Sequence, residues 1–156
     1  MRPPMRPPMR AAAMLLFALL SASCGATTPR DIVVGEDQCH FCRMAITDPR
    51  FATQVILTTG KIQVFDAVDC LAGYVRGNPA ERIQSVWVAG VTDGDFVRAE
   101  DAGFLLDATR RGPMGRILAF ASPADAQAAV ATYGGTPVSW TAILADSASL
   151  VQHDDH

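Results

Sequence analysis

The stretch FATQVILTTGKIQVFDAVDCLAGYVRGN, residues 51–78, decides the fold of this 156-residue protein. In its first half, apolar and polar residues alternate on both sides of Thr59-Gly60, a typical turn dipeptide. Alternation around such a turn predicts a β-hairpin with strands at residues 53–58 and 61–65. In its second half, apolar residues recur at helical spacing, which predicts a helix directly after the hairpin.

The sequence also predicts where that helix begins and ends. Asp66 is the predicted N-cap, because a short carboxylate can accept hydrogen bonds from the free N–H groups of the first turn. Gly77-Asn78-Pro79 predicts the end of the helix. The apolar run IQSVWVAG, residues 83–90, predicts a third strand, so residues 31–90 form a ββαβ unit.

Residues 91–148 repeat this order. The segments are a strand in GFLLDAT (103–109), a strand in GRILAFA (115–121), a helix in SPADAQAAVATYGG (122–135) and a strand in TPVSWTAIL (136–144). Ser122 is the predicted N-cap of the helix and Gly134 its predicted end. The predicted fold class is therefore α+β, with two similar ββαβ units in one domain.

The first 23 residues are typical of a secretory signal, with three arginines before a short apolar run. Small residues then precede Cys24, which resembles a lipoprotein signal, in which the cleaved chain begins at a lipid-modified cysteine. We therefore expect a lipid anchor at Cys24, a tether over residues 24–30 and a flexible tail at 149–156. The expected location is a periplasm-facing membrane, with the outer membrane favoured over the inner.

The expected mature chain has 133 residues, the size of one domain. Removing the three signal arginines changes its formal charge from −3 to −6, which argues against a nucleic-acid partner. Because disulfides persist outside the cytoplasm, the cysteines of the mature chain are also candidates for structural bonds.

The stretch EDQCHFCRMAITD, residues 36–48, holds a Cys-x-x-Cys pair, Cys39 and Cys42. Haem attachment is excluded because arginine, not histidine, follows the second cysteine. A thioredoxin-like pair follows a buried strand, whereas acidic residues precede this one and are expected to raise a thiol pKa. A structural zinc site needs four ligands. Cys70 could supply a third, but its place on the predicted helix beside Leu71 favours a core residue.

Met44 follows Cys42 by two residues and favours a different kind of site from the haem, thioredoxin-like and zinc sites. Thiolate and thioether donors together favour Cu(I), since soft ligands select a soft ion. Met114 lies in the turn GPMG, where a long apolar side chain has little surface to fill. The predicted ligands are therefore sulfur atoms from two distant segments. His40 remains open as either a ligand or a loop histidine.

These residues resemble the NosL family, the nitrous oxide reductase accessory lipoproteins. The matching features, in chain order, are Cys24, Cys39-x-x-Cys42-x-Met44, FDAVDCL (65–71), Trp87, Pro113-Met114-Gly115 with ILAF, and Tyr133-Gly134-Gly135. The resemblance implies a pair of ββαβ units similar to the organomercurial lyase MerB. It also implies metal ligation by Cys39, Cys42, Met44 and Met114. Gly112 is a departure, because threonine or serine is expected before the Pro-Met-Gly motif.

The function implied by this resemblance is a Cu(I) chaperone rather than an enzyme. Its partners would be nitrous oxide reductase, whose copper-sulfide cluster receives the copper, and an ABC-type maturation complex, with the lipid anchor on the membrane. The chain would be a monomer or a weak dimer. Two alternatives stay open: a thiol-disulfide oxidoreductase using Cys39 and Cys42, and, by fold analogy alone, a carbon-mercury lyase using Cys70 near Asp66 and Asp69.

Overall fold

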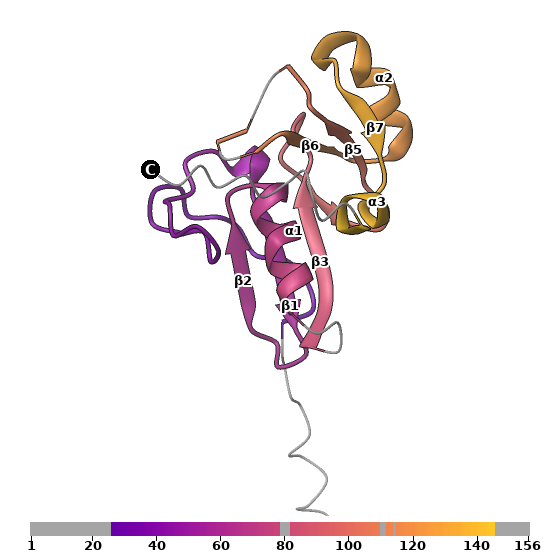
Figure 1. The fold of residues 1–156 in the computed structure, drawn as a ribbon. Helices are drawn as coiled ribbons and strands as arrows, with labels where there is room; N and C mark the ends of the chain where they lie inside the picture. Colours follow the sequence, from indigo (N-terminus) through magenta and orange to yellow (C-terminus); the bar gives the residue numbers. More distant parts are fainter. Residues whose placement is uncertain (1–25, 79–81, 110–111, 114, 146–156) are drawn as a thin grey trace, which may run out of the picture.

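The computed structural model describes residues 26–78, 82–109, 112–113 and 115–145. The predicted anchor Cys24, the predicted ligand Met114 and the predicted tail lie outside the described residues. Two antiparallel sheets, each with a helix packed against it, form the body of the molecule (Figure 1). Within the described ranges, no helix has both the length and the apolar character needed to cross a bilayer.

The first sheet has the strand order β2-β1-β3-β4. Its strands are β1 (Thr53–Leu57), β2 (Ile62–Phe65), β3 (Ile83–Ala89) and β4 (Phe96–Arg98), and a 3-10 turn, η1 (Pro49–Phe51), precedes them. The predicted hairpin is confirmed: Thr53 pairs with Phe65, and Gly60 takes a positive φ of 79° in the turn. Helix α1 (Val68–Gly77) packs against β1 and β2. The short edge strand β4 was not predicted, because three residues give too brief an alternation to read.

The second sheet has the order β6-β5-β7, which matches the order β2-β1-β3 of the first. Its elements are β5 (Gly103–Leu106), β6 (Ile117–Phe120), α2 (Pro123–Tyr133), β7 (Thr136–Val138) and α3 (Trp140–Ala145). Two ββαβ units are therefore confirmed, and Ser122 caps α2 as predicted. The predicted strand over 136–144 is wrong after Val138. Ser139 accepts a hydrogen bond from the N–H of Ala142 at 3.2 Å, which starts α3 instead.

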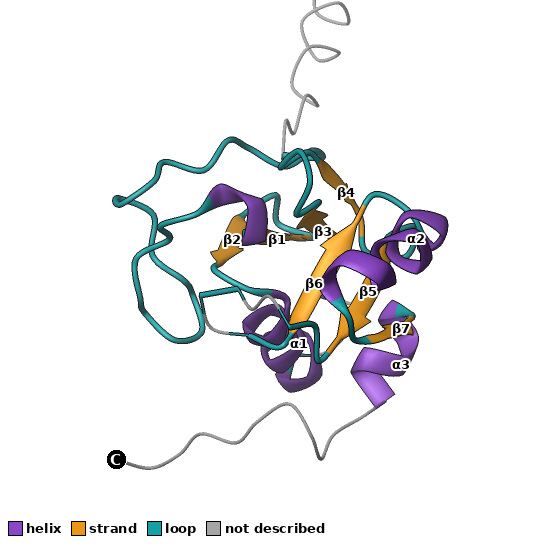
Figure 2. Ribbon diagram, turned by 90° about the horizontal axis from the view of Figure 1, so that it is seen from above, coloured by secondary structure: helices purple, strands orange, loops and turns teal. Residues whose placement is uncertain are grey.

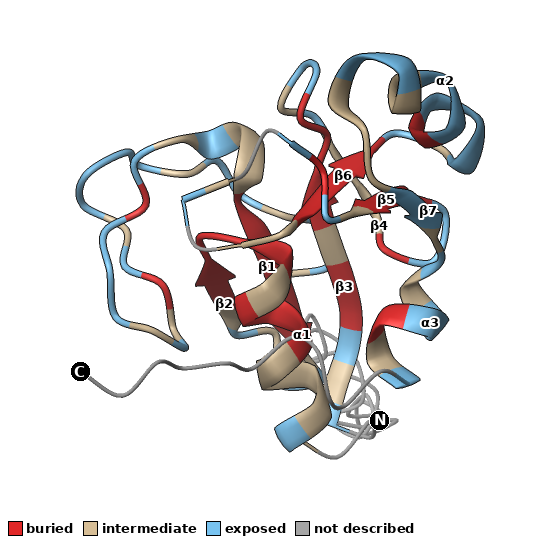
Figure 3. Cartoon of the chain, turned by 45° about the horizontal axis from the view of Figure 1, so that its top comes forward, coloured by how far each residue is buried: buried red, intermediate tan, exposed pale blue. Residues whose placement is uncertain are grey.

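One hydrophobic core joins the two units. It contains Phe65 and Leu71 from the first unit together with Phe104, Ile117 and Ile143 from the second. The buried segments lie where the two sheets and α1 face one another (Figure 3). Seen from above, β6 is the strand of the second sheet nearest the first unit, and α1 lies beside it (Figure 2). The start of α1 is therefore the place where residues from both halves meet.

Candidate metal centre

The Cys39–Met44 segment forms a tight hairpin that precedes the first sheet. The N–H of Cys39 donates to the carbonyl of Met44 at 2.8 Å, and the N–H of Arg43 donates to the carbonyl of Cys39 at 3.0 Å. Arg43 takes a left-handed φ of 68°, which turns the chain sharply after Cys42. The N–H of Cys42 points at the Cys39 sulfur at 3.5 Å. The local fold therefore brings the two thiols of the Cys-x-x-Cys pair together.

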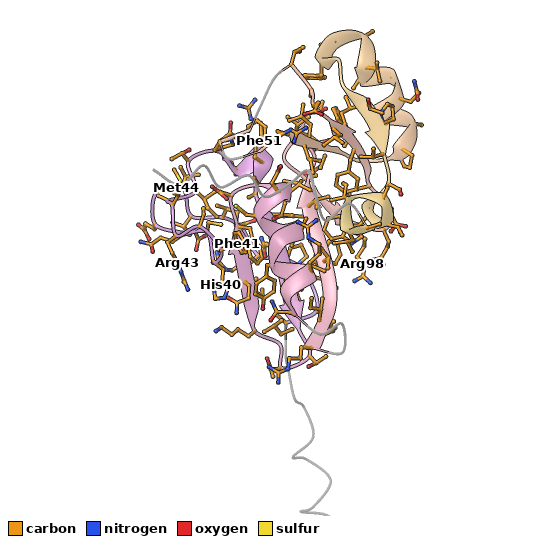
Figure 4. All side chains as sticks on the ribbon, viewed as in Figure 1. His40, Phe41, Arg43, Met44, Phe51 and Arg98 are labelled. Atoms are coloured by element: carbon orange, nitrogen blue, oxygen red, sulfur yellow. The ribbon has the colours of Figure 1, made fainter. Side chains whose placement is uncertain are left out.

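Two contacts hold this hairpin against the first unit. The N–H of His40 donates to the carbonyl of Val64 in β2 at 2.8 Å. The ring of Phe41 lies against Gly73 of α1, where a Cβ atom would come within 2.9 Å of Phe41 Cζ. A glycine at position 73 therefore allows the ring to approach the helix. Figure 4 shows Phe41 over α1, whereas Arg43 and Met44 lie on the outer side of the hairpin.

The junction between β2 and α1 supplies the other half of the centre, through Asp66 and Cys70. The predicted capping role of Asp66 is wrong: the N-cap of α1 is Ala67, which makes no side-chain cap bond. Asp66 turns inward instead and is 1% exposed. Cys70 is buried as predicted, at 6% exposed, and lies four positions after Asp66, in the first turn of α1. Both side chains reach the thiols of the hairpin.

The four side chains form one compact cluster. The sulfur atoms of Cys39, Cys42 and Cys70 and a carboxylate oxygen of Asp66 all lie within 4.8 Å of one another. The Cys42 thiol donates to Asp66 Oδ2 at 3.5 Å, and the three cysteines form no disulfide. Among the described residues, nothing hydrogen-bonds to Asp66 Oδ1, although it is buried. An unpaired buried carboxylate oxygen is costly, and a cation bound between these four groups would satisfy it.

The cluster shifts the pKa values of its three thiols in different directions. A hydrogen bond from Cys70, helped by the N–H groups of Cys42 and Asp66, lowers the pKa of Cys39 from 9.0 to about 6. Burial, together with the neighbouring Cys39, raises the pKa of Cys42 to about 11. The hydrogen bond to Cys39 and burial also raise the pKa of Cys70. The lowered pKa favours the thiolate form of Cys39, which is the form that binds metals.

The expectation that acidic neighbours raise the pKa of the first cysteine is wrong. Asp37 forms an ion pair with Arg30 at 2.6 Å, and this hydrogen-bonded guanidinium lowers the pKa of the carboxyl group. Its charge is therefore compensated, and the hydrogen bonds that reach the sulfur itself decide the pKa of Cys39.

The remaining predicted ligands are placed differently. Met44 belongs to the same hairpin, and its side chain is 50% exposed. His40 is outside the four-residue cluster; its ring packs edge-on against Tyr74 and Phe65, with centroids 5.5 and 6.2 Å away. Burial and the nearby charges of Arg43 and Lys61 lower its pKa. His40 therefore contributes packing and a backbone hydrogen bond to the centre.

The chain on both sides of position 114 is tied to the first unit. A Cβ atom on Gly112 would come within 2.8 Å of Phe51 Cδ1, and one on Gly115 would overlap the carboxylate of Asp69. Asp69 directly precedes Cys70. Gly115 therefore lies beside the helix turn that carries the third cysteine, a relation that cannot be read from the linear sequence.

Asp66 is the residue of the centre that sequence analysis missed as a metal ligand, and Cys70 is the one for which it favoured a core role over that of a third ligand. The available signal was their spacing: FDAVDC places a carboxylate just before a helix start and a thiol four positions later, in the first turn. Capping was the competing explanation for Asp66, and burial explained Cys70 equally well.

Comparison with known proteins agrees with this architecture. The family model of NosL matches residues 32–148 of this chain. The chain belongs to the NosL family. None of the curated proteins compared with it matches. Among solved structures, the copper chaperone NosL from Shewanella denitrificans is similar, with a TM-score of 0.64 and 23% sequence identity. The match covers 72% of this chain and 93% of that one, and it confirms the NosL fold.

Proposed function

We propose that this protein is a Cu(I) chaperone that carries one copper ion in a sulfur-rich centre and passes it to a partner. The observation that carries this proposal is the convergence of three thiols from two segments on a buried carboxylate with an unpaired oxygen. Thiolates select Cu(I) over hard cations. The similarity to a NosL protein described as a copper chaperone supports the same choice.

The proposed ligands are Cys39 and Cys42 of this cluster, with Met44 and Met114 as the thioether donors. Cys70 and Asp66 complete the cluster and would face the bound ion from the side of α1. The centre has a closed and an open side. Cys39 is fully buried, whereas Cys42 is partly exposed and Met44 is half exposed. A partner's ligand can therefore approach from the hairpin side, and replacing one ligand at a time allows transfer without releasing a free ion. Metal binding would displace the protons held by the other thiols.

The decisive experiment is an anaerobic Cu(I) titration against a competing chelator. We expect tight binding of one Cu(I), a large loss when Cys39 and Cys42 are both changed to serine, and a smaller loss for the double variant M44L/M114L. V34L is a matched control, because Val34 is an exposed apolar residue of the same segment outside the motif. Equal affinity of the wild type and the double serine variant would overturn the proposal.

The thiol-disulfide oxidoreductase alternative has one observation in its favour, the low pKa of Cys39. The geometry argues against it, because the thiolate is buried while the accessible thiol, Cys42, has a raised pKa and is a poor nucleophile. An insulin-reduction assay separates the two functions. Turnover that survives in M44L/M114L would support the oxidoreductase.

We further propose that the copper recipient is nitrous oxide reductase, acting with its ABC-type maturation complex, and that a lipid on Cys24 holds the chaperone at the membrane. Deletion of the gene should leave the reductase deficient in its copper-sulfide cluster, while other periplasmic copper enzymes keep their metal. The variant C24S should move from the membrane fraction to the soluble fraction and keep its Cu(I) affinity. A fully loaded reductase in the deletion strain would contradict this assignment of the recipient.

A further inference from the structure

The three thiols of the cluster are carried by two separate segments. Cys39 and Cys42 belong to the hairpin, and Cys70 lies in the first turn of α1. All three are free, and their sulfur atoms lie within 4.8 Å of one another. Oxidation of the metal-free protein can therefore join the hairpin to itself or to the helix, and the surroundings of the thiols decide between these two bonds.

The closest relation among the thiols is between Cys39 and Cys70. The hydrogen bond between these two side chains is the first cause of the lowered pKa of Cys39 and of the raised pKa of Cys70. For Cys42 the first cause is burial, and its thiol also donates to Asp66 Oδ2 at 3.5 Å. The structure therefore favours a pair that crosses from hairpin to helix over the Cys-x-x-Cys pair.

Cys39 and Cys70 are also the two buried thiols. Their residues are 0% and 6% exposed, whereas Cys42 is partly exposed. A disulfide requires the two sulfur atoms to approach to about 2 Å. The hairpin is held by its hydrogen bond to β2 and by the ring of Phe41 on α1, so both segments stay in contact while the bond forms. Because exposed disulfides are the more easily reduced, the buried bond is expected to outlast one at Cys42.

We propose that the metal-free protein is a redox switch, in which a small or protein disulfide oxidises the cluster and the stable product is a Cys39–Cys70 bond. Cys42 is the thiol through which oxidation enters. The consequence for copper rests on the proposed function: the bond removes the ligand Cys39, so the oxidised protein does not hold Cu(I) tightly. The cross-link itself does not depend on that function.

Three exchange steps balance the reaction, with the oxidant written RSSR. The Cys42 thiol attacks RSSR, which forms a Cys42–S–S–R bond and releases one RSH. Cys39 then attacks the sulfur of Cys42 and releases the second RSH. Finally Cys70 attacks the sulfur of Cys39, and its proton passes to the freed thiol of Cys42. In sum, Cys39 and Cys70 lose two electrons and two protons, and RSSR is reduced to two RSH.

The test is disulfide mapping in C24S, which keeps only the three thiols of the cluster. The folded, reduced, metal-free protein is treated with oxidised glutathione, alkylated and digested without reduction. Trypsin leaves Cys39 and Cys42 together in peptide 31–43 and Cys70 in peptide 62–76, so mass spectrometry distinguishes the possible bonds. We expect two of the three thiols to be lost, the two peptides to be joined through Cys39, and alkylation at Cys42 alone.

The same protein unfolded in guanidinium chloride is the matched control. Without tertiary structure, thiols that are near in sequence meet more often, so the expected product there is the Cys39–Cys42 bond. A Cys39–Cys42 bond as the end product in the folded protein, or three unreacted thiols, would overturn the proposal.

Two measurements test the entry through Cys42. Alkylation at early times should trap glutathione on Cys42 of the wild-type cluster. The variant C42S, shown to be folded by far-UV circular dichroism, should form the Cys39–Cys70 bond several-fold more slowly. Glutathione trapped first on Cys39 or Cys70, or an unchanged rate in C42S, would contradict the entry role.

Anaerobic Cu(I) competition on the reduced and the oxidised protein separates this inference from the function. We expect oxidation to lower the affinity more than about 100-fold, since loss of even an outer partner of a ligand costs about 10–100-fold. Reduction followed by removal of the reductant should restore it. A reduced protein that binds no Cu(I) overturns the chaperone function and leaves the mapped bond standing. A Cys39–Cys70 bond that leaves the affinity unchanged overturns the switch and leaves the chaperone function standing.

Discussion

Replacing Asp66 by asparagine is expected to stabilise the metal-free protein and to weaken its metal binding. Asp66 is 1% exposed, and among the described residues its Oδ1 has no hydrogen-bond partner. An unsatisfied buried polar group costs about 1–3 kcal/mol. Asparagine has the same shape, keeps one oxygen for the Cys42 thiol, and presents an amide that can donate to a neighbouring sulfur.

The free energy of unfolding of metal-free D66N should therefore rise by about 1–2 kcal/mol. For a domain of this size, such a gain raises the Tm by about 3–6 °C. The measurement is urea and thermal unfolding under reducing, metal-free conditions. In the same variant the Cu(I) affinity should fall, by about 10–100-fold, because the centre loses a charged oxygen beside the thiols.

The neighbouring aspartate provides a control of opposite sign. Both oxygens of Asp69 accept hydrogen bonds from backbone N–H groups. In D69N one of these oxygens is replaced by an NH2 group, which cannot accept a hydrogen bond from the N–H group that faces it. Its free energy of unfolding should fall by about 1–3 kcal/mol. If both asparagine variants shift stability in the same direction, or if D66N keeps wild-type Cu(I) affinity, the reasoning from the unpaired oxygen is refuted.

Four further predictions concern the thiols and the hairpin that carries two of them. In metal-free reduced protein, ultraviolet titration should detect one thiolate near pH 6, because hydrogen bonds lower the pKa of Cys39 to about 6; no thiolate below pH 8 would contradict this. The free energy of unfolding should rise between pH 6 and 9, where only the unfolded chain protonates Cys39, and fall between pH 9 and 11, where only the folded chain keeps Cys42 protonated. C70A should move the titration midpoint toward pH 9, since it removes the main hydrogen-bond donor; a midpoint that stays near 6 would assign the low pKa to backbone N–H groups. G73A should change stability by less than about 1 kcal/mol, because better helix propensity offsets the displaced ring of Phe41; a larger loss in urea unfolding would show that the ring cannot move away from the helix.

Local sequence patterns, such as turn and capping residues, predicted much of the fold. The hairpin around Thr59-Gly60 and the start of α2 at Ser122 depend on turn and capping residues that act within a few positions, and both are confirmed. The segment after Val138 was misassigned as a strand, because it contains residues that are common in strands. In the structure, Ser139 accepts a hydrogen bond that starts a helix there. The identity of Cys39 and Cys42 as a pair is likewise local, since their hairpin closes on itself.

The composition of the metal centre was decided by tertiary structure. From sequence, Asp66 is predicted to be a helix cap and Cys70 a core residue. In the structure, the hydrogen bond from the N–H of His40 to the carbonyl of Val64 holds the hairpin at the end of β2. Only then do a carboxylate and a third thiol face the pair, and only then does Cys39 gain the hydrogen bonds that lower its pKa. Sequence alone determines which donors exist. Their convergence, burial and charge depend on contacts between distant segments, which no local pattern encodes.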